Sequence, residues 1–473
     1  VDLVVRARYV LPVEPAGAVL ERHAVVVAGG RVVAVAPWEV AAAQYRAAAV
    51  EELGEHVLMP GLVNAHTHAA MNNMRGVADD LPLMEWLSQA IWPLEGEFVC
   101  HDYVRHGTLS AIAEMIRSGT TTVNDMYFHA DAALPVYEAS GLRAAVGLVV
   151  LDFPCPSSGS ADEALEKAEK TIAAWKDRCD RISLTLAPHA PYTVSDGSFE
   201  RIVGLADRYD LRVHLHLHET EPETTHSAAG STDMHRHLSE HKCRPMANLD
   251  RLGLVGPRLI AVHMTQVTEE EVARCAEAGV SVVHCPVSNM KLASGSCPVQ
   301  KLLDAGVNVA LGTDSSVSNN TLDMLHELRA ASLLGKLVAM DATAVKAMTA
   351  IEMATINGAR ALGLGHRVGS LVPGKEADMI ALRLDSLETT PLYDVASHVV
   401  YAASRDHVTD VWVQGRRLMR SRELTTLDLA KIKKETEAWG RKMLAARKQE
   451  REEVPITSPP SDTSTPAVGS ADA

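Results

Sequence analysis

Residues 60–68 read PGLVNAHTH, an apolar run that ends on two histidines, His66 and His68. Side chains two positions apart in a strand point to the same face, so both imidazoles could bind one metal ion. The pair alone does not complete a metal site, and by itself it fits a structural role slightly better than a functional one. The rest of the chain therefore has to supply the missing ligands.

The composition indicates an acidic globular protein. With 473 residues the chain is too long for one compact core, which favours one large domain and a smaller one. The net charge of −15 is spread along the chain, so neither nucleic acid nor a membrane is expected as a partner. No apolar run approaches the ~20 residues of a membrane helix, and no secretory signal is recognisable at the N-terminus.

The cysteines favour a cytoplasmic protein. The seven cysteines are scattered and form no C-x-x-C pair, which is typical of a chain kept in a reducing compartment. The 21 histidines are the unusual feature of the composition. Only their positions can show whether they are functional.

The two ends of the chain have the same β texture. Residues 1–59 and 369–425 carry short β-branched runs separated by turn signals such as Gly29–Gly30 and Gly415. Two such half-sheets cannot bury their apolar faces separately. We therefore expect one small composite β-sandwich domain made from both ends. A charged helix at 426–454 and a disordered Pro/Ser/Thr-rich tail at 455–473 should follow.

Residues 60–368 alternate between short apolar segments and amphipathic helical stretches. Eight such segments predict a (β/α)8 TIM barrel. A doubly wound sheet is the alternative, but its Gly-rich turn is missing, because GLGHRVG has the wrong spacing and follows no strand. The eight predicted strands lie within residues 61–68, 120–126, 142–153, 181–192, 211–220, 259–266, 280–289 and 307–316.

Polar residues gather at the predicted carboxyl ends of these strands, where a barrel holds its active site. In the fifth segment, His214, His216 and His218 share one face, and spacing does not say which of them binds a metal. Glu219 follows where the strand should end, and an acid beside a metal is a natural proton shuttle.

The sixth and eighth segments end on His263 and Asp314. Either residue alone would more often be structural, but coincidence at four strand ends favours one site. Three imidazoles and a carboxylate suit a borderline cation such as Zn²⁺, with a position left for water. The HLSEH stretch, His237 to His241, also fits a zinc-protease pattern, but as an isolated match it is better read as a surface helix.

With these residues, the chain resembles the amidohydrolase superfamily, in the branch of chlorohydrolases and aminopurine deaminases. The resemblance extends from residue 1 to about residue 420, through PGLVNAHTH, HLHLHET, AVHMTQ, HCPVSN, GTDSSVSNN and GSLVPGKEADMIAL. Within this branch, MRGVADDLPLMEWLSQAIWPLEGEFV and APHAPYTVS are most similar to the 5′-methylthioadenosine/S-adenosylhomocysteine deaminases.

The resemblance implies a role for each candidate residue. One divalent metal ion, Zn²⁺ or alternatively Fe²⁺, would be held by His66, His68, His216 and Asp314. Glu219 would be the proton shuttle, and His263 would orient the attacking water. Substrate contacts are expected from Glu95, His189 and His263, and supporting roles from His214, His218 and His284.

The implied activity is hydrolytic deamination of a 6-aminopurine nucleoside, a small molecule, by a cytoplasmic homo-oligomer, either a dimer or a tetramer. The alternatives are a triazine-type chlorohydrolase or a guanine or pterin deaminase with the same site, and more remotely a non-catalytic metal-binding barrel. The chain departs from its relatives at Ser315 to Val317, where smaller residues are usual, which affects the expected pocket shape. Only Arg178 and Arg181, by region, are candidates for pairing with a homocysteine carboxylate.

Overall fold

Eight parallel strands form the barrel of the computed structural model, which describes residues 1–229 and 242–453. Each predicted segment contains one strand, and neighbours in the sequence are neighbours in the sheet. The prediction of a (β/α)8 barrel is therefore confirmed. The barrel strands are β5 (Leu62–Thr67), β6 (Thr120–Tyr127), β7 (Arg143–Val150), β8 (Ile182–Pro188), β9 (Arg212–Leu217), β10 (Leu259–His263), β11 (Ser281–His284) and β12 (Asn308–Leu311).

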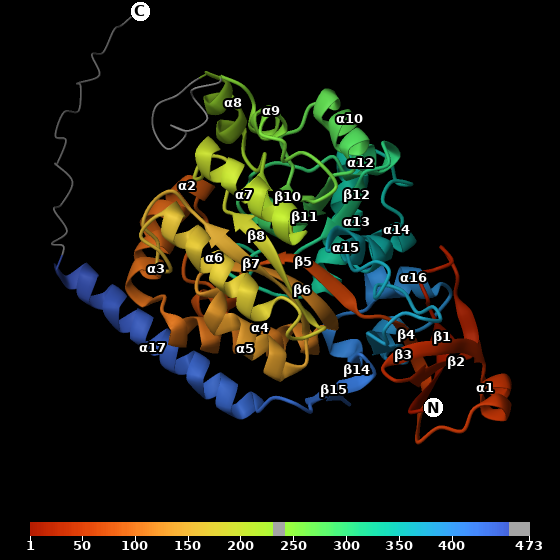
Figure 1. Ribbon diagram of the computed structural model, residues 1–473. Coiled ribbons are helices and arrows are strands. Elements are labelled where there is room, and N and C mark those ends of the chain that lie inside the picture. Colours follow the sequence, from red (N-terminus) through yellow and green to blue (C-terminus); the bar gives the residue numbers. More distant parts are fainter. Residues whose placement is uncertain (230–241, 454–473) are drawn as a thin grey trace, which may run out of the picture.

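A second eight-stranded sheet is built from both ends of the chain, as predicted. Its order is β16-β15-β14-β13-β4-β1-β2-β3, and its strands form one continuous mixed sheet in which only the β1–β4 pair is parallel. Figure 1 shows these red and blue strands together beside the barrel. They are β1 (Leu3–Val10), β2 (Leu20–Ala28), β3 (Arg31–Pro37), β4 (Ala49–Pro60), β13 (Met379–Arg383), β14 (Val408–Val413), β15 (Arg416–Arg420) and β16 (Glu423–Leu424).

Helices surround the barrel (Figure 1). Several of them begin at a residue whose side chain caps the first turn. Ser160 and Ser195 each accept a backbone N–H of the first turn that follows, and Thr268 and Glu271 form a capping box. The helices that follow or flank barrel strands are α4 (His101–Arg117), α5 (Ala130–Ser140), α6 (Ala161–Trp175), α7 (Asp196–Tyr209), α8 (Glu221–Ala229), α9 (Pro245–Arg251), α10 (Glu269–Ala278), α11 (Pro286–Lys291), α12 (Val299–Asp304), α13 (Met324–Ala339), α14 (Ala347–Met353) and α15 (Ile356–Ala361).

Three further groups of helices lie outside this alternation, and the third belongs to the small domain and its connections. Between β5 and α4 the chain forms a short helical insertion, and after the small sheet the long helix α17 runs along α4 (Figure 1). Trp439 of α17 donates to His106 Nδ1 at 3.2 Å and packs against Tyr103. These elements are η1 (Ala69–Met74), α2 (Leu83–Trp86), η2 (Leu87–Ile91), α3 (Trp92–Phe98) and α17 (Leu429–Glu453), with α1 (Trp38–Gln44), α16 (Val395–Ser397), η3 (Leu387–Thr389), η4 (His398–Ala402) and η5 (Arg405–His407) in the small domain and its connections.

The barrel closes where β12 meets β5, and this seam is not a regular ladder. The N–H of Asp314 donates to His66 O at 3.1 Å, and the side chain of Asn64 accepts from Thr313 N at 3.0 Å. Gly312 makes the approach possible, because a Cβ there would lie 2.8 Å from the backbone N and O of His66. The closure thus brings the first predicted ligand strand against the last.

An ion cluster joins the amino end of the barrel to the small domain. Arg143 begins β7, is 1% exposed, and donates to both oxygens of Asp378 at 2.8 and 3.1 Å and to Glu376 at 2.5 Å. Glu376 also accepts from Arg367 at 2.7 Å. Buried charges are tolerated only when they are paired, so this cluster fixes how the two sheets are joined.

Some expectations lie outside the described residues. The predicted disordered tail at 455–473 and the HLSEH stretch belong to segments that are not described. Within the described residues, no helix is long and apolar enough to cross a membrane.

The Arg143 cluster leads to a stability prediction. Arg143→Met should lower the free energy of unfolding by about 3–5 kcal/mol, because it leaves the buried carboxylate of Asp378 without its cation. Urea unfolding followed by circular dichroism measures this. Arg178→Met is the control: it removes the exposed pair with Glu138 and should cost below about 1 kcal/mol. Equal losses for the two variants would contradict the assignment.

Candidate metal centre and active site

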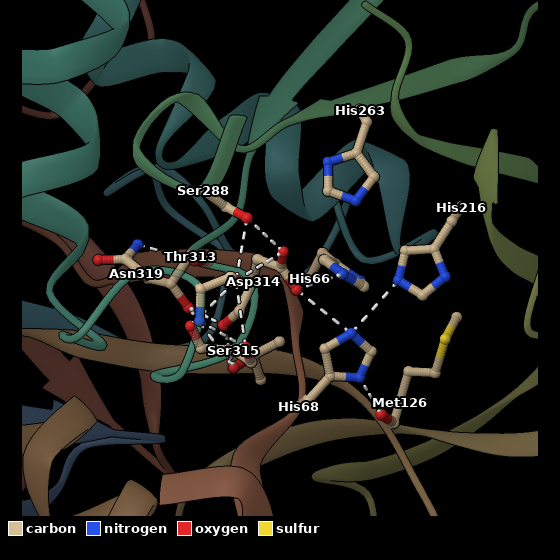
Figure 2. Close-up of polar contacts among 12 residues, drawn as sticks. His66, His68, Met126, His216, His263, Ser288, Thr313, Asp314, Ser315 and Asn319 are labelled. Carbon is tan, nitrogen blue, oxygen red and sulfur yellow. Dashed lines mark hydrogen bonds and ion pairs between the residues drawn. The ribbon is translucent and has the colours of Figure 1, made fainter. Parts of the chain in front are cut away.

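Three imidazole Nε2 atoms converge at the carboxyl end of the barrel (Figure 2). His68 Nδ1 donates to Met126 O at 2.5 Å, and His216 Nδ1 donates to His189 O at 2.7 Å. His66 Nδ1 lies 2.8 Å from His214 Nε2. Bonds to the carbonyls at Nδ1 fix the ring orientation and leave Nε2 free to bind a metal. The Nε2 atoms of His68 and His216 are 3.3 Å apart.

Asp314 completes this group with one carboxylate oxygen. Its Oδ1 lies 3.3 Å from His66 Nε2 and 3.2 Å from His68 Nε2. Its Oδ2 accepts from Ser288 Oγ at 2.6 Å and from Ser318 Oγ at 3.0 Å, as Figure 2 shows for Ser288. Burial raises the pKa of Asp314, but His66 and His68 outweigh it and hold the pKa well below its ordinary value. Asp314 is therefore an anion that offers Oδ1 to the histidines.

The four donors fit a metal ion. Ligand atoms of His66, His68, His216 and Asp314 all lie within 4.8 Å of one another. The Nε2 of His66 is buried and makes no hydrogen bond to any described residue. Burial lowers the pKa of His66 to about 4 and that of His216 well below its ordinary value, so both rings are neutral ligands at pH 7. Nitrogen and carboxylate donors in this number suit Zn²⁺ or a similar cation.

Glu219 and His263 face each other beside this group. Glu219 Oε2 lies 3.7 Å from His263 Nε2, and the ring of His263 stacks on that of His216 with centroids 5.4 Å apart. The Asn289 amide donates to His263 Nδ1 at 3.0 Å, which leaves the proton on Nε2. Burial, with the charge of Asp314, raises the pKa of Glu219 to about 8. Glu219 therefore carries a proton at neutral pH.

The backbone around these residues is strained and is held by further buried polar groups. His218, His263 and Asp314 have φ values of 53°, 77° and 58°, a region unusual for residues with a side chain. Glu223 is 2% exposed and accepts the N–H of His218 at 2.8 Å and of Glu219 at 2.7 Å. The Glu223 carboxyl group thus holds the backbone at the strained residue His218 and at Glu219 through these two hydrogen bonds.

The structure separates the three histidines of the fifth strand, among which spacing left the ligand undecided and the resemblance implied His216. His216 joins the donor group, His214 bonds to His66, and His218 Nε2 accepts the N–H of Met246 at 3.1 Å. His284 is fully buried, and neither ring nitrogen bonds to a described residue.

Sequence reasoning missed several supporting residues. Ser288 and Asn289 stand in the HCPVSN stretch, yet no role was assigned to them. Glu223 has one signal, its place four residues after Glu219 at the start of a helix. Ser318 carries no signal, because its role depends on how the loop after Asp314 turns.

A cavity of about 490 Å³ opens beside His68 and His189. Glu95 lies in its wall, where Oε1 accepts from Tyr127 OH at 2.8 Å. Burial raises the pKa of Glu95 to about 7, despite this bond. Burial lowers the pKa of His189 to about 3, so this ring is neutral. Glu95 and His189 thus lie where a substrate could meet them, whereas His263 does not line this cavity.

Two expectations about the pocket are not met. Arg178 and Arg181 precede β8, at the barrel end opposite the site, and both bond to Glu138. They therefore cannot bind a carboxylate in this cavity. Residues 315–317 are buried beneath Asp314 and do not line the cavity, so their size does not shape its wall.

Comparison with known proteins shows the family to which this chain belongs. A sequence model of the amidohydrolase family matches residues 57–418. A 5-methylthioadenosine/S-adenosylhomocysteine deaminase of Saccharophagus degradans is 44% identical over 94% of this chain and 98% of its own length. A protein of the same name from Teredinibacter turnerae is 42% identical over 94% of this chain and 99% of its own.

Two solved structures are similar to this chain over nearly its whole length. An adenosine deaminase from Xanthomonas campestris with bound zinc is 50% identical, with a TM-score of 0.91 over 94% of this chain and 99% of its own. Atrazine chlorohydrolase from Arthrobacter aurescens is 23% identical, with a TM-score of 0.83 over 92% of this chain and 99% of its own. The latter likeness extends to the fold alone.

The hydrogen bond to Asp314 Oδ2 can be tested by metal binding. Ser288→Ala should weaken metal affinity about 10- to 100-fold, because Asp314 loses a partner that orients it. Competition with a chelator, read by metal analysis, measures the affinity. Ser332→Ala is the control, since it removes a buried serine that bonds to Val345 O, away from this site. Unchanged affinity in Ser288→Ala would refute the orienting role.

Proposed function

Because this chain belongs to the amidohydrolase family, we propose that it hydrolytically deaminates a 6-aminopurine nucleoside. The substrate would be 5′-methylthioadenosine, S-adenosylhomocysteine or both, and the products the inosine analogue and ammonia. The chain is a metal-dependent hydrolase of C–N bonds. The observation that carries the proposal is the place of Glu219, whose Oε2 lies 3.7 Å from His263 Nε2, beside the donor group of His66, His68, His216 and Asp314. The names of relatives that are 42–44% identical support the choice of substrate.

We propose that these four residues hold one divalent ion, Zn²⁺, with Fe²⁺ as the alternative. The zinc bound to the Xanthomonas campestris relative supports this choice. Such an ion, when bound, lowers the pKa of a water molecule to ~7.

The residues of the chain would then move the protons of the reaction. Glu219 donates its carboxyl proton to a purine ring nitrogen, which makes C6 electrophilic. As water oxygen bonds to C6, the Nε2–H of His263 stabilises the negative charge that develops on this oxygen. Asp314 accepts one proton of the water and passes it to the amino group, so that the C6–N bond breaks and ammonia leaves. The hydroxyl proton that remains on the new oxygen returns to the Glu219 carboxylate as the C6 carbonyl forms, which restores the acid.

Glu95 and His189 would position the nucleoside. The Glu95 carboxylate can accept hydrogen bonds from two ribose hydroxyls, and the neutral ring of His189 can bond to the purine. Their place in the cavity wall beside His68 supports these roles.

The alternatives differ in the substrate and not in the metal-binding residues. A triazine-type chlorohydrolase or a guanine or pterin deaminase would use the same donor group. A non-catalytic barrel would bind the metal ion without using Glu219 as an acid. An absorbance assay with 5′-methylthioadenosine, S-adenosylhomocysteine, adenosine, guanine and a chlorotriazine separates them. No turnover of any adenine nucleoside would refute the proposed function.

The assembly and location of the protein complete the proposal. A homo-oligomer is supported by Leu333, Leu337 and Met340, which expose apolar surface at the end of α13. A cytoplasmic location is supported by the seven cysteines, which are scattered along the sequence and form no C-x-x-C pair. Light scattering after size exclusion tests the oligomeric state.

The role of Glu219 can be tested directly. Glu219→Gln should retain metal yet reduce kcat about 10²- to 10⁴-fold, because the amide cannot supply the proton. Steady-state kinetics and metal analysis on the same sample measure both quantities. Glu221→Gln, an exposed neighbour, should leave both unchanged. Near-normal turnover of Glu219→Gln would exclude the shuttle role.

Glu95 leads to a pH prediction. Its pKa of about 7 means that the carboxylate forms as the pH rises through neutrality. The ratio of kcat/KM between wild type and Glu95→Gln should therefore rise with pH through about 7 and then level off. The exposed Glu97→Gln variant, on the same helix, should show a constant ratio. A flat ratio for Glu95→Gln would contradict a role for its charge.

A further inference from the structure

The part of the substrate cavity farthest from the metal donors is apolar. On the metal side the wall contains His68, Met126 and His189, and Glu95 stands in the wall with Tyr127. Beyond them the wall is built by two segments, the helices that end in α3 and the loop after β7. Their contributions are Trp86, Leu87, Ile91 and Trp92 from the helices and Leu151, Phe153, Pro154, Cys155 and Pro156 from the loop.

An aromatic contact joins these two segments where the cavity meets solvent. The Trp92 and Phe153 rings pack edge to face, with centroids 6.5 Å apart and planes at 66°. Phe153 is 39% exposed, which places this contact at the outer end of the cavity. A substituent that reaches this end therefore meets aromatic and aliphatic surface.

No basic side chain of a described residue lines this end of the cavity. Among the described residues that line the cavity, none is lysine or arginine. Lys167 lines a neighbouring cavity, but its Nζ donates to Ser157 O at 2.6 Å and pairs with Glu163 at 2.7 Å. Glu95, the one carboxyl group among the described lining residues, would repel an anion once it is deprotonated.

The shape of a nucleoside fixes which substituent meets this wall. C6 of the purine must lie at the metal donors, and C5′ of the ribose is at the opposite end of the molecule. A ribose bound at Glu95 then directs its 5′ substituent to Trp92, Phe153 and Cys155. A methylthio group can be buried there, whereas a homocysteine arm brings an ammonium and a carboxylate to the aromatic and aliphatic residues described at this end, which pair with neither.

We propose that Trp92, Phe153 and Cys155 make this enzyme selective for nucleosides with an uncharged, apolar 5′ substituent, and hence for 5′-methylthioadenosine over S-adenosylhomocysteine. This inference rests on the proposed function. Trp92 and Phe153 are the specificity-determining residues, because they bridge the two segments around the 5′ group.

Three substrates separate charge from length. The kcat/KM for S-adenosylhomocysteine should be about 10- to 100-fold below that for 5′-methylthioadenosine, as expected for charges without partners. The compound 5′-butylthioadenosine has an arm of comparable length without charges, and its kcat/KM should stay within about fivefold of the methylthio compound. Equal kcat/KM for S-adenosylhomocysteine and 5′-methylthioadenosine would overturn the inference. So would butylthioadenosine as poor as S-adenosylhomocysteine, because length would then decide.

A variant that adds a cation tests the same wall from the protein side. Phe153→Arg should lower the ratio of kcat/KM for 5′-methylthioadenosine to kcat/KM for S-adenosylhomocysteine about tenfold. The change should come chiefly from a lower KM for S-adenosylhomocysteine. Phe153→Met is the neutral control and should keep the preference. Identical preferences in the two variants would contradict the inference. If the proposed function itself is wrong, the wild-type protein turns over no adenine nucleoside, and this result is distinct from a loss of the preference alone.

Discussion

The backbone hydrogen bond from Asp314 N–H to His66 O, 3.1 Å long, closes the barrel and assembles the metal donors at once. It fixes β12 against β5, so Asp314 Oδ1 lies 3.3 Å from His66 Nε2. Gly312 permits the approach, because any side chain there would collide with the His66 backbone. Barrel closure and metal binding therefore depend on the same few atoms. A substitution that shifts β12 against β5 should also move the metal donors apart.

Two buried carboxyl groups near this seam are in opposite protonation states. Asp314 is anionic because two imidazoles face Oδ1 and two serine hydroxyls donate to Oδ2. Glu219 is equally buried, but its carboxyl group has two weak contacts, 3.4 Å to Ser294 Oγ and 3.7 Å to His263 Nε2, and feels the charge of Asp314. Environment alone thus makes one carboxyl a ligand and the other an acid. The proposed deamination needs both.

The donor group and the substrate cavity come from different parts of the fold. Strand ends of the barrel supply the donors, which suit hydrolysis of many substrates. The cavity wall comes mainly from the insertion between β5 and α4 and from the loop after β7. These segments are connections from a strand to the helix that follows it, β5 to α4 and β7 to α6, so they can change without disturbing the barrel closure. Substrate choice is accordingly decided by residues such as Trp92 and Phe153 rather than by the metal donors.

The sequence alone determined the eight strands, the composite small domain and the residues at the strand ends, because hydrophobic patterning and chain order are local properties. Strand parity could not choose among His214, His216 and His218, since it gives all three the same face, and His216 was implied only by the resemblance. The ladder is irregular between Asn64 and Thr67, and His218, His263 and Asp314 have positive φ, so side-chain directions depart from simple alternation at the site. Only the tertiary structure showed that Glu223, Ser288 and Asn289 hold the polar groups and that Arg178 lies at the opposite end. The physical reason is that such contacts join segments far apart in the chain, and only the closed barrel sets their distances.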